Sequence, residues 1–203
     1  MKNIYKKGLT IASAGVLTVW LTGCMHTQAQ PGVNTSQAAQ AANTQNTTIT
    51  ISEIEAAQKQ WAQGLVEIGA AYTSGGNYQQ TASDLINKLY AYNYERGVVL
   101  FKPTKAVEAP FRRSHQSALS YFVGGDKYYP EDKGFALAPW VNIKFNNDAI
   151  YVHGDVAVVM GQYTFTNADN DQAQVEYTLG YVKDAQGNLK IFIQHSSLPF
   201  QAN

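Results

Sequence analysis

Apolar residues recur at spacings of three and four over segment 51–72. They form one stripe: Ile54, Ala57, Trp61, Leu65, Ile68 and Tyr72. This period predicts an amphipathic helix. Thr50 or Ser52 would cap it, and Gly75-Gly76 would end it. The same spacing recurs over 78–92 and predicts a second helix.

Beyond residue 97 the pattern changes to short β-branched and apolar runs. Segment 98–101 predicts a buried strand ended by Pro103, and segment 114–123 a short helix capped by Ser114. Four strand-like stretches follow, at 140–145, 156–166, 173–182 and 189–196. Turn-forming residues occupy the junctions at 146–148, 167–171 and 184–188.

Short connections make these consecutive strands antiparallel, because parallel neighbours need a long crossover. Helices followed by a meander of strands predict the α+β class. We expect a cone: a curved antiparallel sheet wrapped around the N-terminal helices, with a pocket at its open end.

The first fifty residues predict export and attachment. Lys2, Lys6 and Lys7 precede an apolar run over 9–21, which is typical of a signal peptide and too short to span a bilayer. Leu21-Thr22-Gly23-Cys24 resembles the lipobox of bacterial lipoproteins, in which the cysteine is acylated. An ordinary signal peptide that happens to contain cysteine is the alternative.

We therefore expect a signal peptide at 1–23, a lipidated Cys24 with a polar, flexible tether over 24–49, and one folded domain over 50–203. The expected location is the periplasm, with contact to the membrane only through the lipid. Met25, rather than an acidic residue, favours the outer membrane by resemblance to bacterial sorting patterns.

Composition narrows the function. The chain has 15 Lys plus Arg and 15 Asp plus Glu, so it offers no field for gathering nucleic acid. Its one cysteine forms no internal disulfide, and its four histidines lack metal-ligand spacing. No glycine-rich phosphate loop is present. The 13 tyrosines can line a pocket with hydroxyl groups.

The richest polar stretch ends the last strand, at Gln194, His195, Ser196 and Ser197. Side chains alternate along a strand, so Gln194 and Ser196 share one face and His195 and Ser197 the other. A frayed strand end, with its polar groups in water, is the alternative.

Three further positions are candidates. Thr104 follows a strand end and either faces a ligand or satisfies a turn, whereas Tyr121 either faces a ligand or packs in the core. Phe111-Arg112-Arg113 either places a guanidinium near an anion or has its arginines on the surface.

Five ordered blocks carry a family resemblance. They are Val99-Leu-Phe-Lys-Pro-Thr-Lys-Ala106, Ala118-Leu-Ser-Tyr-Phe-Val-Gly124, Glu131-Asp-Lys-Gly-Phe-Ala-Leu137 with Pro139-Trp140, Val175-Glu-Tyr-Thr-Leu-Gly-Tyr181 and His195-Ser-Ser-Leu-Pro199. Together they resemble the iota-class carbonic anhydrases over about residues 51–200. The resemblance implies a cystatin-like cone, similar to the association domain of calcium/calmodulin-dependent kinase, and reversible hydration of carbon dioxide to bicarbonate.

The resemblance also implies site residues. Some members work without metal and hold the substrate with a threonine, a tyrosine and a serine, which correspond to Thr104, Tyr121 and Ser196. Ser197 is a further candidate for substrate binding. His195 is the candidate for moving the proton, although its strand face points away from Ser196. Other members are described as metal-dependent, so zinc or manganese stays open, although no metal is our expectation.

Gln194 departs from the family strand, which usually reads His-His-Ser-Ser. This substitution keeps two other functions open: a cone that binds another small molecule without catalysis, and a cone that chiefly oligomerises. In each case we expect a homodimer or larger assembly, because cones of this kind usually pair through the exposed sheet face.

Overall fold

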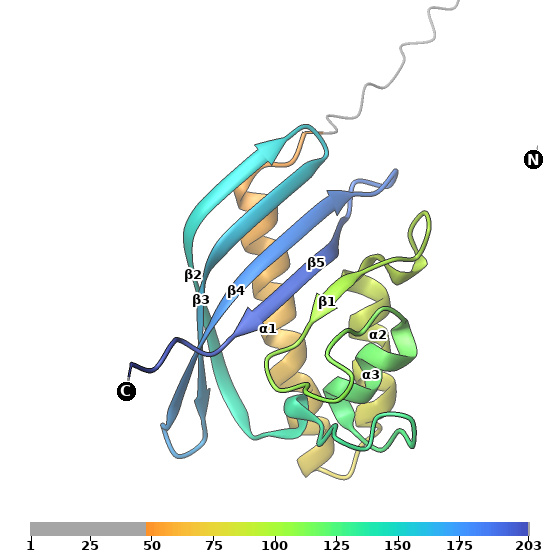
Figure 1. The fold of residues 1–203 in the computed structure, drawn as a ribbon, viewed down its shortest axis with the longest axis vertical. Coiled ribbons are helices and arrows are strands. Elements are labelled where there is room, and N and C mark those ends of the chain that lie inside the picture. The colour runs from red at the N-terminus through yellow and green to blue at the C-terminus, as the bar shows by residue number, and fades with distance from the viewer. Residues whose placement is uncertain (1–47, 203) are drawn as a thin grey trace, which may run out of the picture. The chain divides into compact units, whose positions relative to one another are not determined.

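The computed structural model describes residues 48–202 (Figure 1). The predicted signal peptide, Cys24 and the tether up to residue 47 lie outside the described residues. The helices are α1 (Ile51–Thr73), α2 (Tyr78–Leu89) and α3 (His115–Val123), and the strands are β1 (Leu100–Lys102), β2 (Trp140–His153), β3 (Val156–Asn167), β4 (Gln172–Lys183) and β5 (Leu189–Ser197). Short 3₁₀ turns lie at Ala91–Asn93 and Phe135–Leu137.

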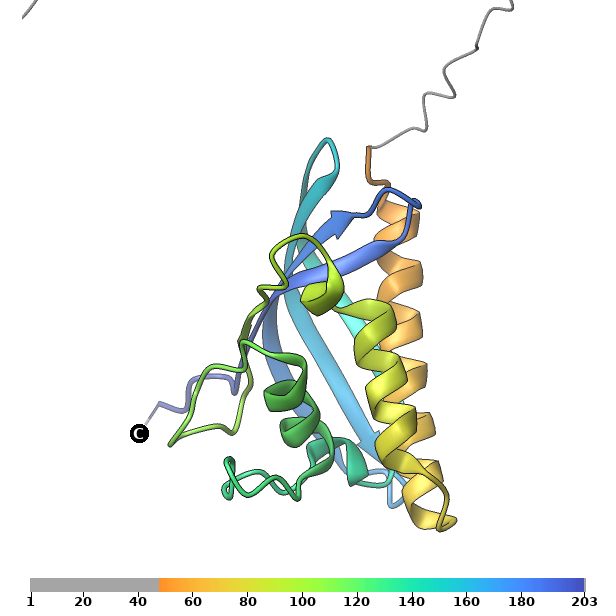
Figure 2. The ribbon, with the colours of Figure 1, turned by 90° about the vertical axis from the view of Figure 1, so that its right-hand side faces the viewer.

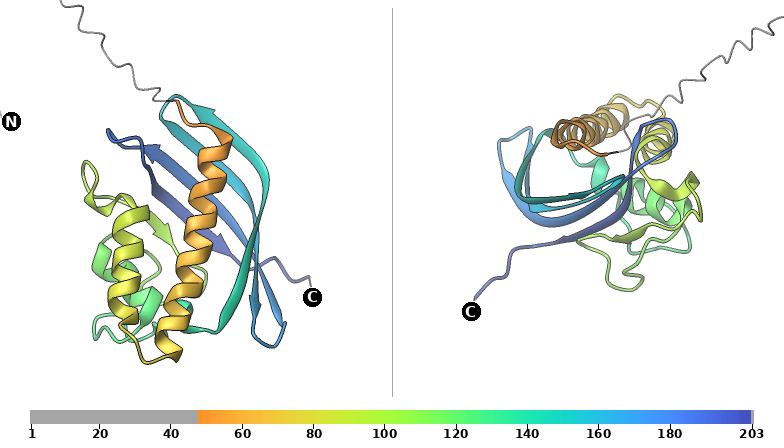
Figure 3. Two further views of the ribbon diagram at one scale, coloured as in Figure 1. Left: turned by 180° about the vertical axis from the view of Figure 1, so that it is seen from behind. Right: turned by 90° about the horizontal axis from the view of Figure 1, so that it is seen from above.

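The predicted α+β class is confirmed. Five strands form one sheet in the order β1-β5-β4-β3-β2. The sheet curves around α1, α2 packs beside that helix, and α3 packs against α2 (Figures 2 and 3). Pairing among β2 to β5 is antiparallel, as expected, whereas β1 pairs in parallel with β5.

Local signals explain where α1 and α3 begin. The Thr50 hydroxyl oxygen accepts a hydrogen bond from the Glu53 backbone N–H, and the Glu53 carboxylate accepts one from the Thr50 backbone N–H. Ser114 and Ser117 form the same reciprocal cap at α3. The expected 51–72 and 114–123 helices are therefore confirmed to within a residue.

The second helix is shorter than predicted. It ends at Leu89, because Tyr90 takes an extended backbone (φ −103°, ψ 151°) and forms a β-bridge with Ile191. This turn carries the Tyr90 ring into the core. The apolar spacing extends to residue 92 because Tyr92 is also buried, although that residue lies in a 3₁₀ turn after the helix.

Two strand predictions are corrected. The expected turn at 146–148 is a bulge inside β2, which continues to His153, and the true turn contains Gly154 with φ of 59°. Gln58 and Tyr177 both hydrogen-bond to Asn147, which holds the bulge in place. The strand predicted at 98–101 lies at 100–102 on the sheet edge, with Leu100 exposed.

The core lies between α1 and the concave face of the sheet. Trp61 of α1 stacks on Tyr163 of β3, with ring centroids 5.6 Å apart and planes 4° apart. Phe145 and Phe165 meet the same tryptophan edge-on. Within residues 48–202, no helix is long and apolar enough to cross a membrane.

Candidate active site

A cavity of about 300 Å³ opens between the concave sheet face, α3 and the loop after β1. Thr104, Tyr121 and Ser196 all line it, although they are far apart along the chain. The other lining residues are mainly aromatic and apolar: Trp61, Phe101, Pro103, Lys105, Phe135, Ala138, Trp140, Tyr163, Phe165, Ala173, Val175, Gln194 and Leu198. The structure therefore places the three predicted hydroxyl side chains, together with that of Tyr163, in one largely apolar cavity.

Tyr121 presents its hydroxyl from α3. Its ring lies 4.9 Å from Phe135 and 5.9 Å from Phe101, and its oxygen accepts the Lys105 backbone N–H at 3.3 Å. Burial raises the pKa of Tyr121 above its ordinary value of 10. The hydroxyl is therefore neutral near pH 7, with its own hydrogen available to a molecule in the cavity.

Thr104 and Ser196 enter the cavity from the loop after β1 and from the neighbouring strand β5. Thr104 follows buried Pro103 just after β1, and Ser196 lies near the end of β5, which pairs with β1. Ser196 is 3 % exposed and hydrogen-bonds to the hydroxyl of Tyr163 on β3. Burial raises the pKa of Tyr163 to about 12, while hydrogen bonds with Ser196 and Gln194 oppose that rise.

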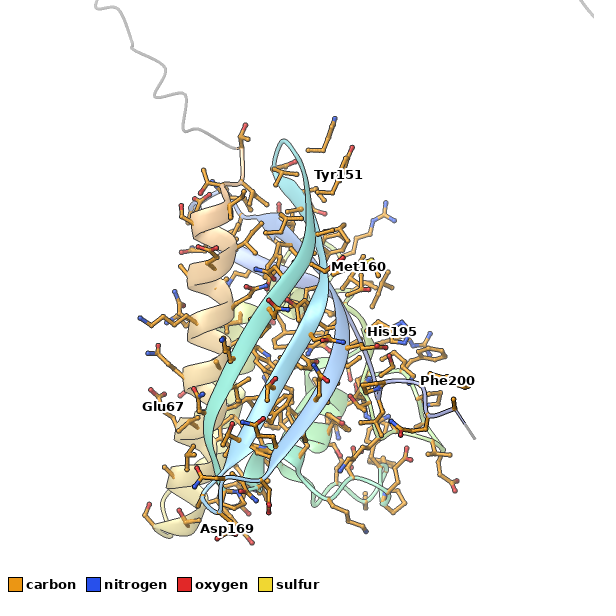
Figure 4. All side chains as sticks on the ribbon, turned by 90° about the vertical axis from the view of Figure 1, so that its left-hand side faces the viewer. Glu67, Tyr151, Met160, Asp169, His195 and Phe200 are labelled. Atoms are coloured by element: carbon orange, nitrogen blue, oxygen red, sulfur yellow. The ribbon has the colours of Figure 1, made fainter. Side chains whose placement is uncertain are left out.

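The structure does not bring His195 and Ser197 into this cavity. Both line a depression on the opposite sheet face, beside Met160 and Glu176. Figure 4 shows His195 and Met160 on the side of the sheet away from α1. The cause is the alternation of side chains along β5, which turns Gln194 and Ser196 inward. His195 and Ser197 therefore lie outside the cavity that Thr104, Tyr121 and Ser196 line.

The cavity has few groups that could move a proton or hold a metal. Among the described residues that line it, Lys105 is the only charged side chain, and none is His, Asp or Glu. Across residues 48–202, no three His, Cys, Asp or Glu side chains are grouped to hold a metal ion. The polar side chains that line the cavity are therefore the hydroxyls, the Gln194 amide and the Lys105 ammonium.

Comparison with known proteins gives the family. The profile of the family "Metal-independent carbonic anhydrase" matches residues 52–198. The chain belongs to this family. A metal-independent carbonic anhydrase from Nostoc sp. is 43 % identical over 159 residues, which cover 77 % of each chain. A cyanobacterial iota-carbonic anhydrase crystallised with bicarbonate has a TM-score of 0.75 and 41 % identity, over 78 % of this chain and 97 % of that one.

Arg112, whose role the sequence did not decide, holds the loop that carries Thr104. Arg112 is fully buried; its guanidinium lies 2.7 Å from Asp132, and its backbone N–H bonds to the Phe101 carbonyl at 2.8 Å. Asp132 also accepts the Ser120 hydroxyl at 2.6 Å. The anion that Arg112 meets is thus the protein's own carboxylate, contributed by the Glu131-Asp132 block.

Glu131 ties down the rest of the loop. Its carboxylate accepts backbone N–H groups of Val107, Glu108 and Ala109 at 2.7, 2.9 and 2.8 Å. These bonds, with that of Ala109 the largest cause, lower the pKa of Glu131 from 4.5 to about 2. Because the folded pKa is the lower one, the stabilisation is complete above pH 4.5 and is lost as pH falls towards 2.

We expect Glu131→Gln to reduce the free energy of unfolding near neutral pH, and this deficit to shrink as the pH falls towards 2. Urea unfolding across the acid range measures it. Glu108→Gln is the matched control. The Glu108 side chain is exposed in the same loop, and the residue contacts Glu131 through its backbone N–H, which the substitution retains. A deficit that stays constant with pH would contradict the assignment.

Proposed function

We propose that the protein hydrates carbon dioxide to bicarbonate and a proton, reversibly and without a metal, in the cavity lined by Thr104, Tyr121 and Ser196. The observation that carries this proposal is the convergence of these three hydroxyls in one cavity of a family member. The solved cyanobacterial relative, which contains bicarbonate, supports the same substrate class.

The reaction needs one water and one carbon dioxide held together. As the water oxygen bonds to carbon, one C=O π bond opens onto oxygen and the water gives up a proton. Neutral hydroxyls are poor bases, so their contribution is to orient the water and donate hydrogen bonds to the oxygens that become negative. The proton then passes to solvent water, because no carboxylate or imidazole of the described chain lines the cavity.

The apolar wall has a role in this scheme. Carbon dioxide is uncharged and enters aromatic surroundings readily, whereas in such surroundings a hydrogen bond to an anion is stronger than in bulk water. Lys105 supplies the one positive charge among the described lining residues. We infer that it favours bicarbonate over neutral solutes at the cavity mouth.

Stopped-flow hydration of carbon dioxide by purified protein tests the proposal. After exhaustive chelation we expect the activity to be unchanged, because no step uses a metal. Activity that disappears on chelation and returns with zinc or manganese would overturn the metal-free mechanism. If the protein were inactive both before and after metal addition, the proposal that it catalyses this reaction would be wrong.

A non-catalytic binding module is the second candidate, because most of the cavity wall is aromatic. In that case the protein would be inactive, and a small apolar ligand would raise its melting temperature. Carbon dioxide hydration lost on Thr104→Val would exclude this candidate.

We further propose that the mature protein is anchored by lipid on Cys24 and faces the periplasm, at the outer membrane. The lipobox-like Leu21-Thr22-Gly23-Cys24 supports this location. Ile49, near the start of the described chain, bonds to Gly154 in the β2–β3 turn, at the opposite end of β2 from Trp140 in the cavity wall. The described part of the chain therefore starts at the end of β2 opposite the cavity.

Cell fractionation tests the anchor. We expect wild-type protein in the membrane fraction and Cys24→Ala protein in the soluble periplasmic fraction, because acyl chains supply the membrane affinity. Cys24→Ala protein that stays with the membrane would contradict lipid attachment at this residue.

We also infer that two copies pair through the outer sheet face. Tyr151 and Met160 are 67 % and 56 % exposed on that face (Figure 4). Exposed large apolar side chains on a sheet favour association with another protein surface. Light scattering coupled to gel filtration should give twice the monomer mass, and a monomer mass would contradict the pairing.

A further inference from the structure

A chain of five buried polar side chains leads from α1 to the cavity. The Trp61 indole N–H donates to the Tyr90 hydroxyl at 2.8 Å, and the Tyr90 hydroxyl donates to Gln194 Oε1. Gln194 and Tyr163 both line the cavity, the Gln194 side chain lowers the pKa of Tyr163, and the Tyr163 hydroxyl is paired with Ser196. All five side chains are at most 3 % exposed, so none exchanges these partners freely with solvent.

The first member fixes the direction of the bonds. An indole N–H can only donate, so the Tyr90 oxygen accepts it and turns its own hydrogen to Gln194. The Gln194 carbonyl oxygen is thereby placed on the Tyr90 side. Its amide NH₂ is left as the group that interacts with Tyr163.

The same reasoning continues to the end of the chain. Once the Tyr163 oxygen accepts from the Gln194 amide, its hydrogen needs a buried acceptor, because an unpaired buried hydroxyl is costly. The structure pairs the Tyr163 hydroxyl with the Ser196 oxygen, which can accept that hydrogen. One hydrogen lies between these two oxygens, so Ser196 keeps its own hydrogen for the cavity.

We propose that Gln194 is a positioning residue, which holds the Ser196 hydroxyl as a hydrogen-bond donor towards the cavity. This inference rests on the proposed function and specifies the role of one of its three hydroxyls: Ser196 donates to an oxygen of the nascent bicarbonate and does not accept the proton of the attacking water. An amide suits this task, because it does not titrate and its two ends differ chemically.

Neutron diffraction on deuterated wild-type protein tests the direction without any assay. We expect the deuterium between Tyr163 and Ser196 to be bonded to the Tyr163 oxygen, and the Ser196 deuterium to point into the cavity. Deuterium bonded to Ser196 and directed at Tyr163 would overturn the proposal, whether or not the protein hydrates carbon dioxide.

A double-mutant cycle tests the consequence for activity. Tyr90→Phe removes one oxygen from outside the cavity wall, and we expect it to lower kcat/KM for hydration about tenfold, the equivalent of one net hydrogen bond. In a Gln194→Met background, which lacks the oriented amide, the same change should cost nothing further.

The cycle separates a positioning role from a structural one. If Tyr90→Phe lowers kcat/KM by the same factor in both backgrounds, it acts through packing and the proposal fails. Tyr181→Phe is the matched control, because it removes another buried tyrosine hydroxyl, on β4, that does not line the cavity. Wild-type protein without activity would defeat the proposed function, and the deuterium positions would then decide the inference alone.

Discussion

Tyr121→Phe is expected to lower kcat/KM for carbon dioxide hydration by about 10²–10³-fold, the usual cost of removing one preorganised donor to an oxyanion. The change removes a single oxygen and retains the ring contacts with Phe101 and Phe135. Stopped-flow hydration at fixed pH measures the loss.

Tyr177→Phe is the matched control for this loss. Its hydroxyl is also on a buried ring, but it donates to Asn147 in the β2 bulge at 2.6 Å and does not line the cavity. We expect this substitution to reduce the free energy of unfolding by about 1 kcal/mol and to leave the hydration activity unchanged. Equal losses of activity in the two variants would show that Tyr121 acts through packing rather than through its hydroxyl.

Arg112→Leu is expected to reduce the free energy of unfolding by about 3–5 kcal/mol, the largest stability effect of any single change considered for this domain. The reason is that Asp132, whose side chain is 1 % exposed, would be left as a buried carboxylate without its cation. Urea or thermal unfolding measures the loss.

Two comparisons isolate the ion pair. Arg113→Leu removes an exposed neighbouring arginine and should change stability by less than about 0.5 kcal/mol. Adding Asp132→Asn to Arg112→Leu should recover part of the loss, because it removes the unpaired charge. If the second substitution made the first one worse, the pair would not be the source of the effect.

The helices were predictable because their signals are local. The stripe through Trp61 and the cap at Thr50 both lie within a few residues of the backbone that they organise. The β2 bulge was not predictable in this way. Asn146-Asn147-Asp148 has turn chemistry, but Gln58, 89 residues away from Asn147, holds that residue within the strand. Tertiary contacts therefore overrode the local preference.

The candidate site was likewise predictable only in part from the sequence. Alternation along the last strand separated Ser196 from His195, but only the curvature of the folded sheet shows which of them faces the cavity. Thr104 and Tyr121 were identified by family resemblance, because neither a turn threonine nor a core tyrosine is distinctive by itself. Arg112 was left open because buried arginines are rare and its partner Asp132 is 20 residues away.

A crystal structure of the wild-type protein with bicarbonate tests most directly whether Thr104, Tyr121 and Ser196 form the substrate site. If three hydroxyls form the substrate site, one bicarbonate will lie in the cavity with oxygens at about 2.7–3.2 Å from the side-chain oxygens of Thr104, Tyr121 and Ser196. Bicarbonate bound instead in the outer depression beside His195, with the cavity free of anion at saturating concentration, would contradict it.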